Sequence, residues 1–311
     1  MNSEPIHIPV LLEETLKMLN VKKDGVYVDA TIGLGGHAEK ILSMISAGGM
    51  LIGIDRDEDA LGYARKRLGN NRAQLKKGRF SQLSETLESM SIREVDGVLF
   101  DLGVSMFQLK TPQRGFSFLS DARLDMRMDV SQKLTAWDVV NTYHEKEIEQ
   151  ILREYGEEPF AKKIAREIAA ARKKRRIDTC EMLSDIVSRV YGGRRRKTHP
   201  ATKTFQAIRI EVNRELDELK QGLQCAVSVL KAGGRLCVIS YHSLEDRAVK
   251  NFMRDSDREG ALMVITKKPV IPTPEEIRRN PSCRSAKLRC AEKIFGVPKK
   301  SATFWGNKDG E

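Results

Sequence analysis

The sequence of 311 residues lacks the features that mark membrane, secreted and zinc-binding proteins. No run of about 18 consecutive apolar residues occurs, so no transmembrane helix is predicted. The first residues also lack the basic and apolar stretches of a secretory signal peptide. The five cysteines are scattered and never form a C-x-x-C pair. This pattern argues against a disulfide framework and a zinc site, and we expect a cytoplasmic protein with reduced thiols and no metal.

Acidic residues are scarce in two stretches, whose combined charge of +17 exceeds the net charge of +11 of the whole chain. Residues 160–215 contain 16 Lys and Arg against 6 Asp and Glu, and residues 267–300 contain 10 against 3. Clustered cations attract phosphate backbones, so we expect a nucleic-acid partner; the alternative is a solvated basic face. The candidates for phosphate contacts are the run 172–176 and the run Arg194, Arg195, Arg196 and Lys197.

Short β-branched runs alternate with helical patterns in the first hundred residues. The predicted strands are 26–30, 50–55, 74–76 and 98–101, with helices at 36–46 and 58–68. Apolar runs of this length, separated by helices, are typical of a buried parallel sheet. These residues therefore predict an α/β fold.

The next predicted strand, 235–240, follows only after 133 residues, whereas a crossover needs about a dozen. Most of this excess has helical periodicity, including a long amphipathic helix predicted at 202–231. We interpret it as a helical domain inserted into the α/β domain. The predicted boundaries place the α/β domain at 1–109 and 216–311 and the basic, substrate-recognising insertion at 110–215.

A glycine-rich turn, Gly33-Leu34-Gly35-Gly36-His37, lies where the first strand leads into the first helix. Glycines there permit a positive φ, and the helix N-terminus presents free N–H groups to a ligand. Asp55 ends the second strand, where a carboxylate can accept hydrogen bonds from ribose hydroxyls. The turn also satisfies the dinucleotide fingerprint G-x-G-x-x-G/A, so NAD, S-adenosylmethionine and a ligand-free turn all remain possible at this point.

Polar side chains around the turn favour S-adenosylmethionine. Asp29 and Thr31 precede the first glycine and suit an ammonium and a carboxylate better than a pyrophosphate. Asp101 ends the fourth strand, where amino-methyltransferases keep an acidic or amide residue. Neither observation decides the cofactor by itself.

An ordered series of motifs resembles the RsmH (MraW) family, which methylates N4 of a decoding-centre cytidine in 16S ribosomal RNA. The resemblance covers residues 6–290, and its motifs are His7-Ile8-Pro9-Val10-Leu11, Asp29-Ala30-Thr31-x-Gly33-x-Gly35-Gly36-His37, Phe100-Asp101-Leu102-Gly103-Val104-Ser105, Arg114-Gly115-Phe116-Ser117-Phe118, Leu124-Asp125-Met126-Arg127-Met128, Thr198-His199-Pro200-Ala201-x-x-x-Phe205-Gln206-x-x-Arg209, Ile239-Ser240-Tyr241-His242-Ser243-Leu244-Glu245-Asp246-Arg247 and Pro281-x-x-Arg284-Ser285-Ala286-Lys287-Leu288-Arg289.

The resemblance implies a class I (Rossmann-like) methyltransferase fold with an inserted helical domain. It also implies S-adenosylmethionine as cofactor and 16S rRNA as substrate, modified at cytidine 1402 in the usual numbering, within the small ribosomal subunit. Carried over by position, the cofactor contacts are Gly35, Gly36, His37, Asp55, Phe80, Asp101 and Gln108.

The chemistry needs an acceptor beside the target amine, because the lone pair of this amine is delocalised into the ring. Asp101 is the candidate, although the segment Asp101-Leu102-Gly103-Val104 lacks the (D/N/S)-P-P-(Y/F/W) motif of many amino-methyltransferases, and Asp101 is open to a cofactor role instead. The base clamp must then come from elsewhere, with Phe116, Phe118 or Tyr241 as candidates. Tyr241 and His242 follow the fifth strand and are predicted to face the RNA.

Two alternatives from other classes stay open on the sequence alone. One is a ribosome-assembly or RNA-binding factor with a vestigial cofactor pocket. The other is an NAD-dependent oxidoreductase, which only the dinucleotide fingerprint suggests. The sequence does not indicate the oligomeric state.

Overall fold

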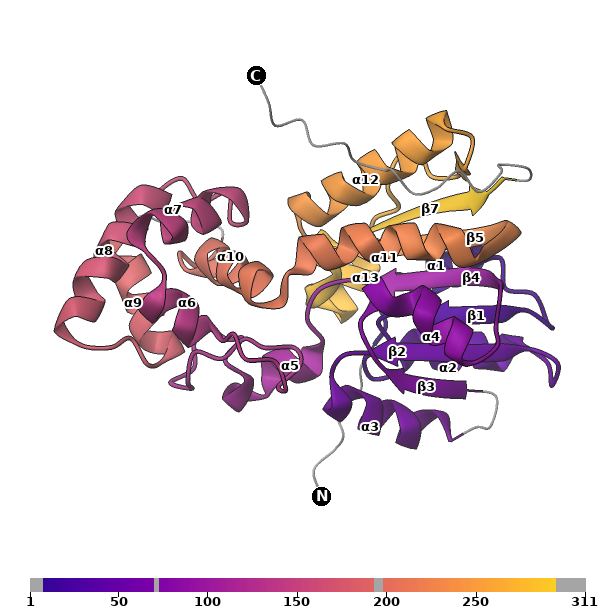
Figure 1. Cartoon of the computed structure of the whole chain (residues 1–311), viewed down its shortest axis with the longest axis horizontal. Coiled ribbons are helices and arrows are strands. Elements are labelled where there is room, and N and C mark those ends of the chain that lie inside the picture. Colours follow the sequence, from indigo (N-terminus) through magenta and orange to yellow (C-terminus); the bar gives the residue numbers. More distant parts are fainter. Residues whose placement is uncertain (1–7, 70–72, 193–197, 295–311) are drawn as a thin grey trace.

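A computed structural model describes residues 8–69, 73–192 and 198–294 of the chain. A mixed sheet with flanking helices forms one part, and a cluster of helices forms the other (Figure 1). Among the described residues, no helix has both the length and the apolar character that crossing a membrane requires.

The sheet has seven strands in the order β3-β2-β1-β4-β5-β7-β6. The first five pair in parallel and β7 pairs antiparallel with β5 and β6. This order reverses direction between β1 and β4, the place where open α/β sheets bind ligands. The strands are β1 (Val26–Asp29), β2 (Met50–Asp55), β3 (Ala73–Lys77), β4 (Val95–Asp101), β5 (Leu230–Ser240), β6 (Leu262–Val264) and β7 (Lys287–Lys293).

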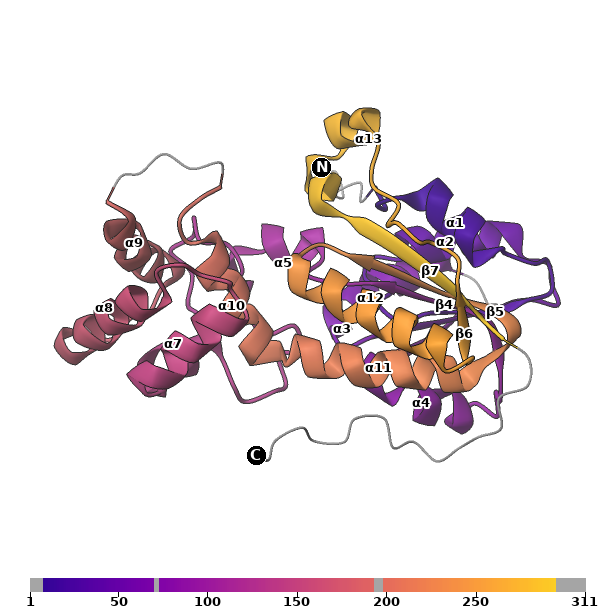
Figure 2. The same cartoon turned by 90° about the horizontal axis from the view of Figure 1, so that it is seen from above.

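Alternating side chains of the strands build a core on each face of the sheet. In β4, Val98 and Phe100 join one core, whereas Leu99 joins the other, as the two-residue period of a strand requires. The first core packs against α4 (Leu83–Ser89), α11 (Glu215–Val229) and α12 (Ser243–Arg258); the second packs against α1 (Leu12–Leu19), α2 (Gly36–Met44) and α3 (Glu58–Leu68). Figure 2 shows the two helical layers on opposite sides of the strands.

The helical part has its own core, made of residues between Phe116 and Val212. After α5 (Met106–Lys110) the chain runs through an extended segment and then forms α6 (Ala136–Thr142), α7 (Glu145–Glu154), α8 (Ala161–Lys174), α9 (Cys180–Tyr191) and α10 (Thr202–Asn213). Short 3-10 turns lie at Phe80–Gln82, Pro112–Arg114 and Pro281–Ser285, and α13 (Pro274–Arg279) precedes β7.

The prediction of one continuous helix over 202–231 is wrong, because the structure has two helices there. Arg214 has a φ of 49° and divides the segment into α10 and α11. The preceding Asn213 explains the break, because its side chain bonds to backbone elsewhere: it accepts from Met128 N–H and donates to the Met126 carbonyl, both at 2.8 Å. The amphipathic stripe continues across the break, so periodicity alone does not reveal it.

The strand after the insertion begins earlier than predicted, at Leu230, and passes through Gly233 with a φ of 76°. The strands β6 and β7 were not predicted from the sequence; they form an antiparallel pair at one edge of the sheet. All five cysteines are free thiols, and four of them are buried.

Gly222 of α11 provides a test of the packing beside the cavity described below. A Cβ at this position would lie 2.5 Å from Cδ2 of Phe80. We expect Gly222→Ala to lower the free energy of unfolding by about 1–3 kcal/mol and to weaken cofactor binding, because Phe80 must move. Urea unfolding and calorimetry measure the two effects. In the control, Gly62→Ala on α3, a Cβ meets nothing within 4 Å; equal losses in both variants would contradict the prediction.

Candidate active site

A cavity opens at the carboxyl ends of β1 and β4, where the strand order reverses. Its walls include the glycine turn, residues after β2 and β3, the loop after β4, Arg209 of α10 and Tyr241 after β5. Of the predicted cofactor contacts, all except Gly35 line it: Gly36, His37, Asp55, Phe80, Asp101 and Gln108.

The glycine turn is held by Asp55. Gly33 has a φ of 50° and donates its N–H to one oxygen of Asp55 at 2.9 Å, while Asp57 N–H donates to the other at 2.9 Å. Burial raises the pKa of Asp55, and these two hydrogen bonds act in the opposite direction. Gly35, with a φ of 80°, caps α2 so that the first N–H groups of this helix point toward the ligand position.

Asp101 lies between His37 and Tyr241. The Tyr241 hydroxyl donates to Oδ1 of Asp101 at 2.8 Å, and Nδ1 of His37 lies 3.6 Å from Oδ2. Nε2 of His37 lies 3.0 Å from the Val10 carbonyl, which can only accept, so we assign the proton of the neutral ring to Nε2. Burial lowers the pKa of His37 to about 4, so the ring is neutral at pH 7. Nδ1 is therefore an acceptor facing a carboxylate.

Of the two polar residues before the first glycine, Thr31 lines the cavity and Asp29 does not. Asp29 is 2% exposed and lies beneath the cavity rather than in its wall. Burial, reinforced by the nearby Asp101 charge, raises its pKa to about 8. The Thr31 hydroxyl oxygen accepts from the backbone N–H of Asp101 at 2.6 Å, and thereby joins β1 to the end of β4.

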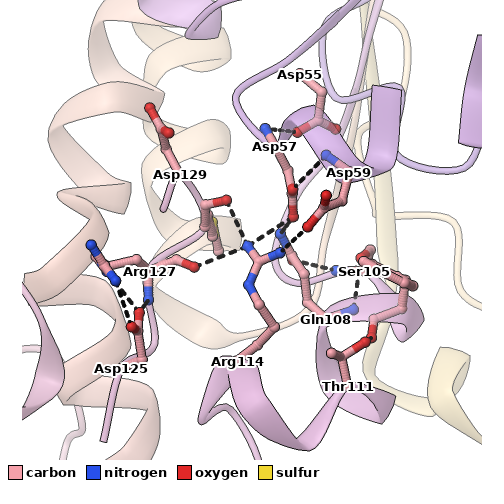
Figure 3. Close-up of polar contacts among 12 residues, drawn as sticks. Asp55, Asp57, Asp59, Ser105, Gln108, Thr111, Arg114, Asp125, Arg127 and Asp129 are labelled. Atoms are coloured by element: carbon pink, nitrogen blue, oxygen red, sulfur yellow. Dashed lines mark hydrogen bonds and ion pairs between the residues drawn. The ribbon is translucent and has the colours of Figure 1, made fainter. Parts of the chain in front are cut away.

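Gln108 lines the cavity, but its side chain belongs to a buried polar network (Figure 3). Its amide nitrogen donates to Asp57 at 2.7 Å, and the same Asp57 oxygen lies 2.9 Å from Nη2 of Arg114. Arg114 also donates to the carbonyls of Arg127 and Met128, at 3.1 and 2.8 Å. This network connects the loop after β2 to the backbone of the insertion.

Phe80 lies 7% exposed against the edge of Phe100, with ring centroids 5.4 Å apart. The guanidinium of Arg56 stands 5.7 Å from the Phe80 centroid. Phe80 is thus a core aromatic that also forms part of the cavity wall.

On the far wall, Arg209, Glu215, His242 and Glu245 form a polar cluster. Arg209 binds Glu215 through two hydrogen bonds of 2.8 Å. Ligand-type atoms of Glu215, His242 and Glu245 lie within 4.8 Å of one another, close enough to surround a cation. However, Nδ1 of His242 accepts the Glu245 N–H at 3.4 Å, and Glu215 is already paired with Arg209. These contacts disfavour an ion, since a metal on Nε2 would require a proton on Nδ1.

The RNA-facing candidates fall in three groups. Tyr241 and His242 line the cavity, whereas Arg194, Arg195, Arg196 and Lys197 lie outside the described residues. In the other basic run, Arg172 donates to the carbonyls of Val140 and Tyr143, so this cation stabilises the insertion.

The clamp candidates differ in exposure and contacts. Phe116 is buried in the helical core, whereas Phe118 is half-buried and stacks on His199 with centroids 4.4 Å apart. Tyr241 is tied to Asp101 by its hydroxyl. Sequence reasoning did not assign roles to Arg114, Arg209, Glu215 or Glu245, although three of these lie in the motifs that carried the resemblance.

A family model described as the MraW methylase family matches residues 4–294. The chain belongs to this family. A "Ribosomal RNA small subunit methyltransferase H" of Persephonella marina is 52% identical over 292 residues, covering 93% of this chain and 99% of the relative. The protein of the same name from Caldicellulosiruptor saccharolyticus is 51% identical over 304 residues, with the same coverage. The predicted family, methyltransferase fold class and S-adenosylmethionine cofactor are confirmed.

Among solved structures, an rRNA methylase from Clostridium thermocellum matches with a TM-score of 0.47 and 16% identity, covering 93% of this chain and all of the other. A methyltransferase from Streptococcus mutans, solved in complex with SAH, matches with a TM-score of 0.43 and 15% identity, covering 94% and 100%.

The buried carboxyl of Asp29 predicts a pH-dependent stability. Its pKa is raised from 3.8 to about 8, so the folded protein holds a proton that the unfolded chain releases, and stability falls as the pH rises from about 4 to 8. His37 acts oppositely, but only between its folded pKa of about 4 and its ordinary 6.5. Urea unfolding at pH 6.5 and 8 tests this: we expect a smaller loss in Asp29→Asn than in the wild type. Equal losses would contradict it.

The Asp57–Arg114 pair predicts a large effect on stability. Both side chains are less than a tenth exposed, and removing one partner of a buried ion pair costs about 3–5 kcal/mol. We therefore expect Arg114→Met to lower the free energy of unfolding by roughly that amount, measured by urea denaturation. The control is Arg65→Met, whose pair with Glu58 is half exposed and contributes about 0–1 kcal/mol. A loss in Arg114→Met no larger than in this control would show that the network carries little stability.

Proposed function

We propose that this chain transfers a methyl group from S-adenosylmethionine to N4 of a cytidine in 16S rRNA, the decoding-centre cytidine 1402 in the usual numbering. The proteins that are similar to this chain over nearly their whole length are named small-subunit rRNA methyltransferases. The finer assignment, to an exocyclic amine, is supported by the geometry around Asp101.

The observation that carries the proposal is a pair of acceptors. Oδ2 of Asp101 and Nδ1 of His37 lie 3.6 Å apart, and the neutral ring of His37 keeps Nδ1 without a proton. An exocyclic amine has two N–H donors and suits such a site. A hydroxyl offers one O–H donor and an aromatic carbon offers no such donor, so the pair of acceptors favours methylation of an amine.

Each residue around Asp101 has a defined task. Asp101 accepts a hydrogen bond from the N4 amine, which localises the nitrogen lone pair and stabilises the positive charge that develops on it. Tyr241 holds Oδ1 of Asp101, and Thr31 fixes its backbone. The glycine turn and Asp55 orient the cofactor, which supplies an activated methyl group on a sulfonium. Holding the amine in line with that methyl is then the main catalytic contribution of the protein.

The insertion of residues 110–215 is assigned to substrate recognition in this proposal. Its cations would bind phosphates and contribute affinity, while the cavity selects the base. Because Asp101 lines a cavity, the target base must leave its stack to reach it. We propose the small ribosomal subunit as the substrate.

Incorporation of label from S-adenosylmethionine into small subunits that lack the modification tests the proposal. We expect label on cytidine N4 with the wild type, and a loss in kcat of about 10²–10³-fold in Asp101→Ala. Glu85→Ala removes an exposed carboxylate on α4 and should retain full activity. Calorimetry separates the two roles of Asp101, because loss of cofactor binding alone leaves kcat at saturating cofactor intact. If the wild type binds the RNA but transfers no methyl group to it, the proposal is wrong and a role as an assembly factor is favoured.

A further inference from the structure

We propose that Arg209 binds the acceptor edge of the target cytosine, N3 and O2, and is thereby a specificity-determining residue. The inference rests on the proposed function and extends it to a second part of the cavity. It follows from the orientation of one guanidinium, from the charge around it, and from its connection to Asp101.

The guanidinium of Arg209 is held in a fixed plane at the cavity wall. Its Nε and Nη2 atoms donate to the two oxygens of Glu215, each at 2.8 Å. Glu215 is 7% exposed and begins α11, directly after the break at Arg214. The Arg209 side chain is 16% exposed, and Nη1 makes no hydrogen bond to the part of the chain that the structure describes. Arg209 therefore presents an unused pair of donors, from Nη1 and the second N–H of Nη2.

The charge of the cluster favours a neutral base over a phosphate. Glu215 balances the charge of Arg209, and Glu245 adds a second carboxylate that interacts with the same guanidinium. Burial acts to raise the pKa of Glu245, but the contact with His242 and then the charge of Arg209 lower it below its usual value, so this carboxylate is ionised at pH 7. An anionic phosphate would meet two carboxylates here, whereas an uncharged ring needs only the directed donors.

The cluster is joined to the acceptor pair by Tyr241. Its backbone N–H donates to Glu245 at 2.9 Å, and its hydroxyl donates to Asp101 at 2.8 Å. One residue thus connects the wall that holds Arg209 with the place assigned to the amine. In cytosine, the amine at C4 is adjacent to N3, and O2 follows N3 along the same edge. A base with N4 at Asp101 can therefore turn two acceptors toward the parallel donors of Arg209.

The same arrangement would disfavour uridine. Uracil has an N–H at N3, which would face the donors of Arg209 and leave buried polar groups unpaired. Such unpaired groups give strong discrimination at sites built to form hydrogen bonds. Arg209 lies on α10, so the insertion supplies this part of the cavity in addition to any contact with the RNA backbone.

A cycle of enzyme and substrate changes tests the inference. Small subunits are reconstituted with 3-deazacytidine at the target position, which replaces N3 by C–H and keeps the amine. For each enzyme we measure the factor by which kcat/KM falls when 3-deazacytidine replaces cytidine. In the wild type this factor combines the altered reactivity of the amine with the lost hydrogen bond, whereas in Arg209→Met it reflects the altered reactivity alone. We expect the wild-type factor to exceed the Arg209→Met factor about 10-fold or more, since a good contact to a base edge is worth roughly 1–3 kcal/mol.

Two further variants make the result specific. Arg209→Lys preserves the charge beside Glu215 without the planar fork, and it should lose the N3 dependence even if Arg209→Met does not fold. Arg79→Met is the matched control, because Arg79 forms a similar pair with Glu218 at 2.9 Å but does not line the cavity. It should respond to 3-deazacytidine as the wild type does.

The outcomes separate the inference from the proposed function. Equal factors in the wild type, Arg209→Met and Arg209→Lys overturn the inference while leaving N4 methylation in place. Absence of methylation of ordinary cytidine by the wild type overturns the proposed function and the inference with it. A wild-type-sized factor in Arg79→Met, with reduced factors in both Arg209 variants, is the result we expect.

Discussion

The hydrogen bonds around Asp55 and Asp57 are the constraint on which the cavity depends. Asp55 accepts the N–H of Gly33 and of Asp57, so one carboxylate fixes both the glycine turn and the loop after β2. Asp57 then binds Gln108 and Arg114, and Arg114 holds the backbone at Met128. Because Met128 N–H donates to Asn213, the chain of contacts continues to the end of α10. The position of Arg209, one turn earlier in that helix, is thus linked to the cofactor turn.

Burial of several carboxyl groups in one region has an electrostatic cost that the structure reduces in different ways. Asp55 is compensated by backbone N–H groups and Asp57 by a guanidinium, whereas Asp29 is protonated at neutral pH. A protonated Asp29 beneath Asp101 avoids a second negative charge next to the proposed catalytic acceptor. The neutral state of His37 has a related consequence, because a protonated ring would donate to Asp101 and compete with the amine for this carboxylate.

Much of the α/β part could be predicted from the sequence, since β1, β2 and β4 are largely apolar and the first four strands are separated by helices. The expected strands at 50–55 and 98–101 coincide with β2 and the end of β4. The antiparallel edge was missed because β6 has only three residues and because four of the seven residues of β7 are charged. The break at Arg214 depends on tertiary hydrogen bonds of Asn213, which no local pattern records. The proposed domain boundaries at 110 and 215 remain an interpretation of these helices and their core.

The candidate site was predictable where a residue follows a strand, as Asp55 and Asp101 do, because the carboxyl ends of parallel strands meet at one edge of the sheet. It was not predictable for Arg114 and Arg209, whose roles require knowing which carboxylate each one meets. The two arginines differ in what they bind. Arg114 uses its donors within the protein, for Asp57 and two backbone carbonyls. Arg209 binds one carboxylate with one edge and lines the cavity, so it is the arginine that we propose for the base.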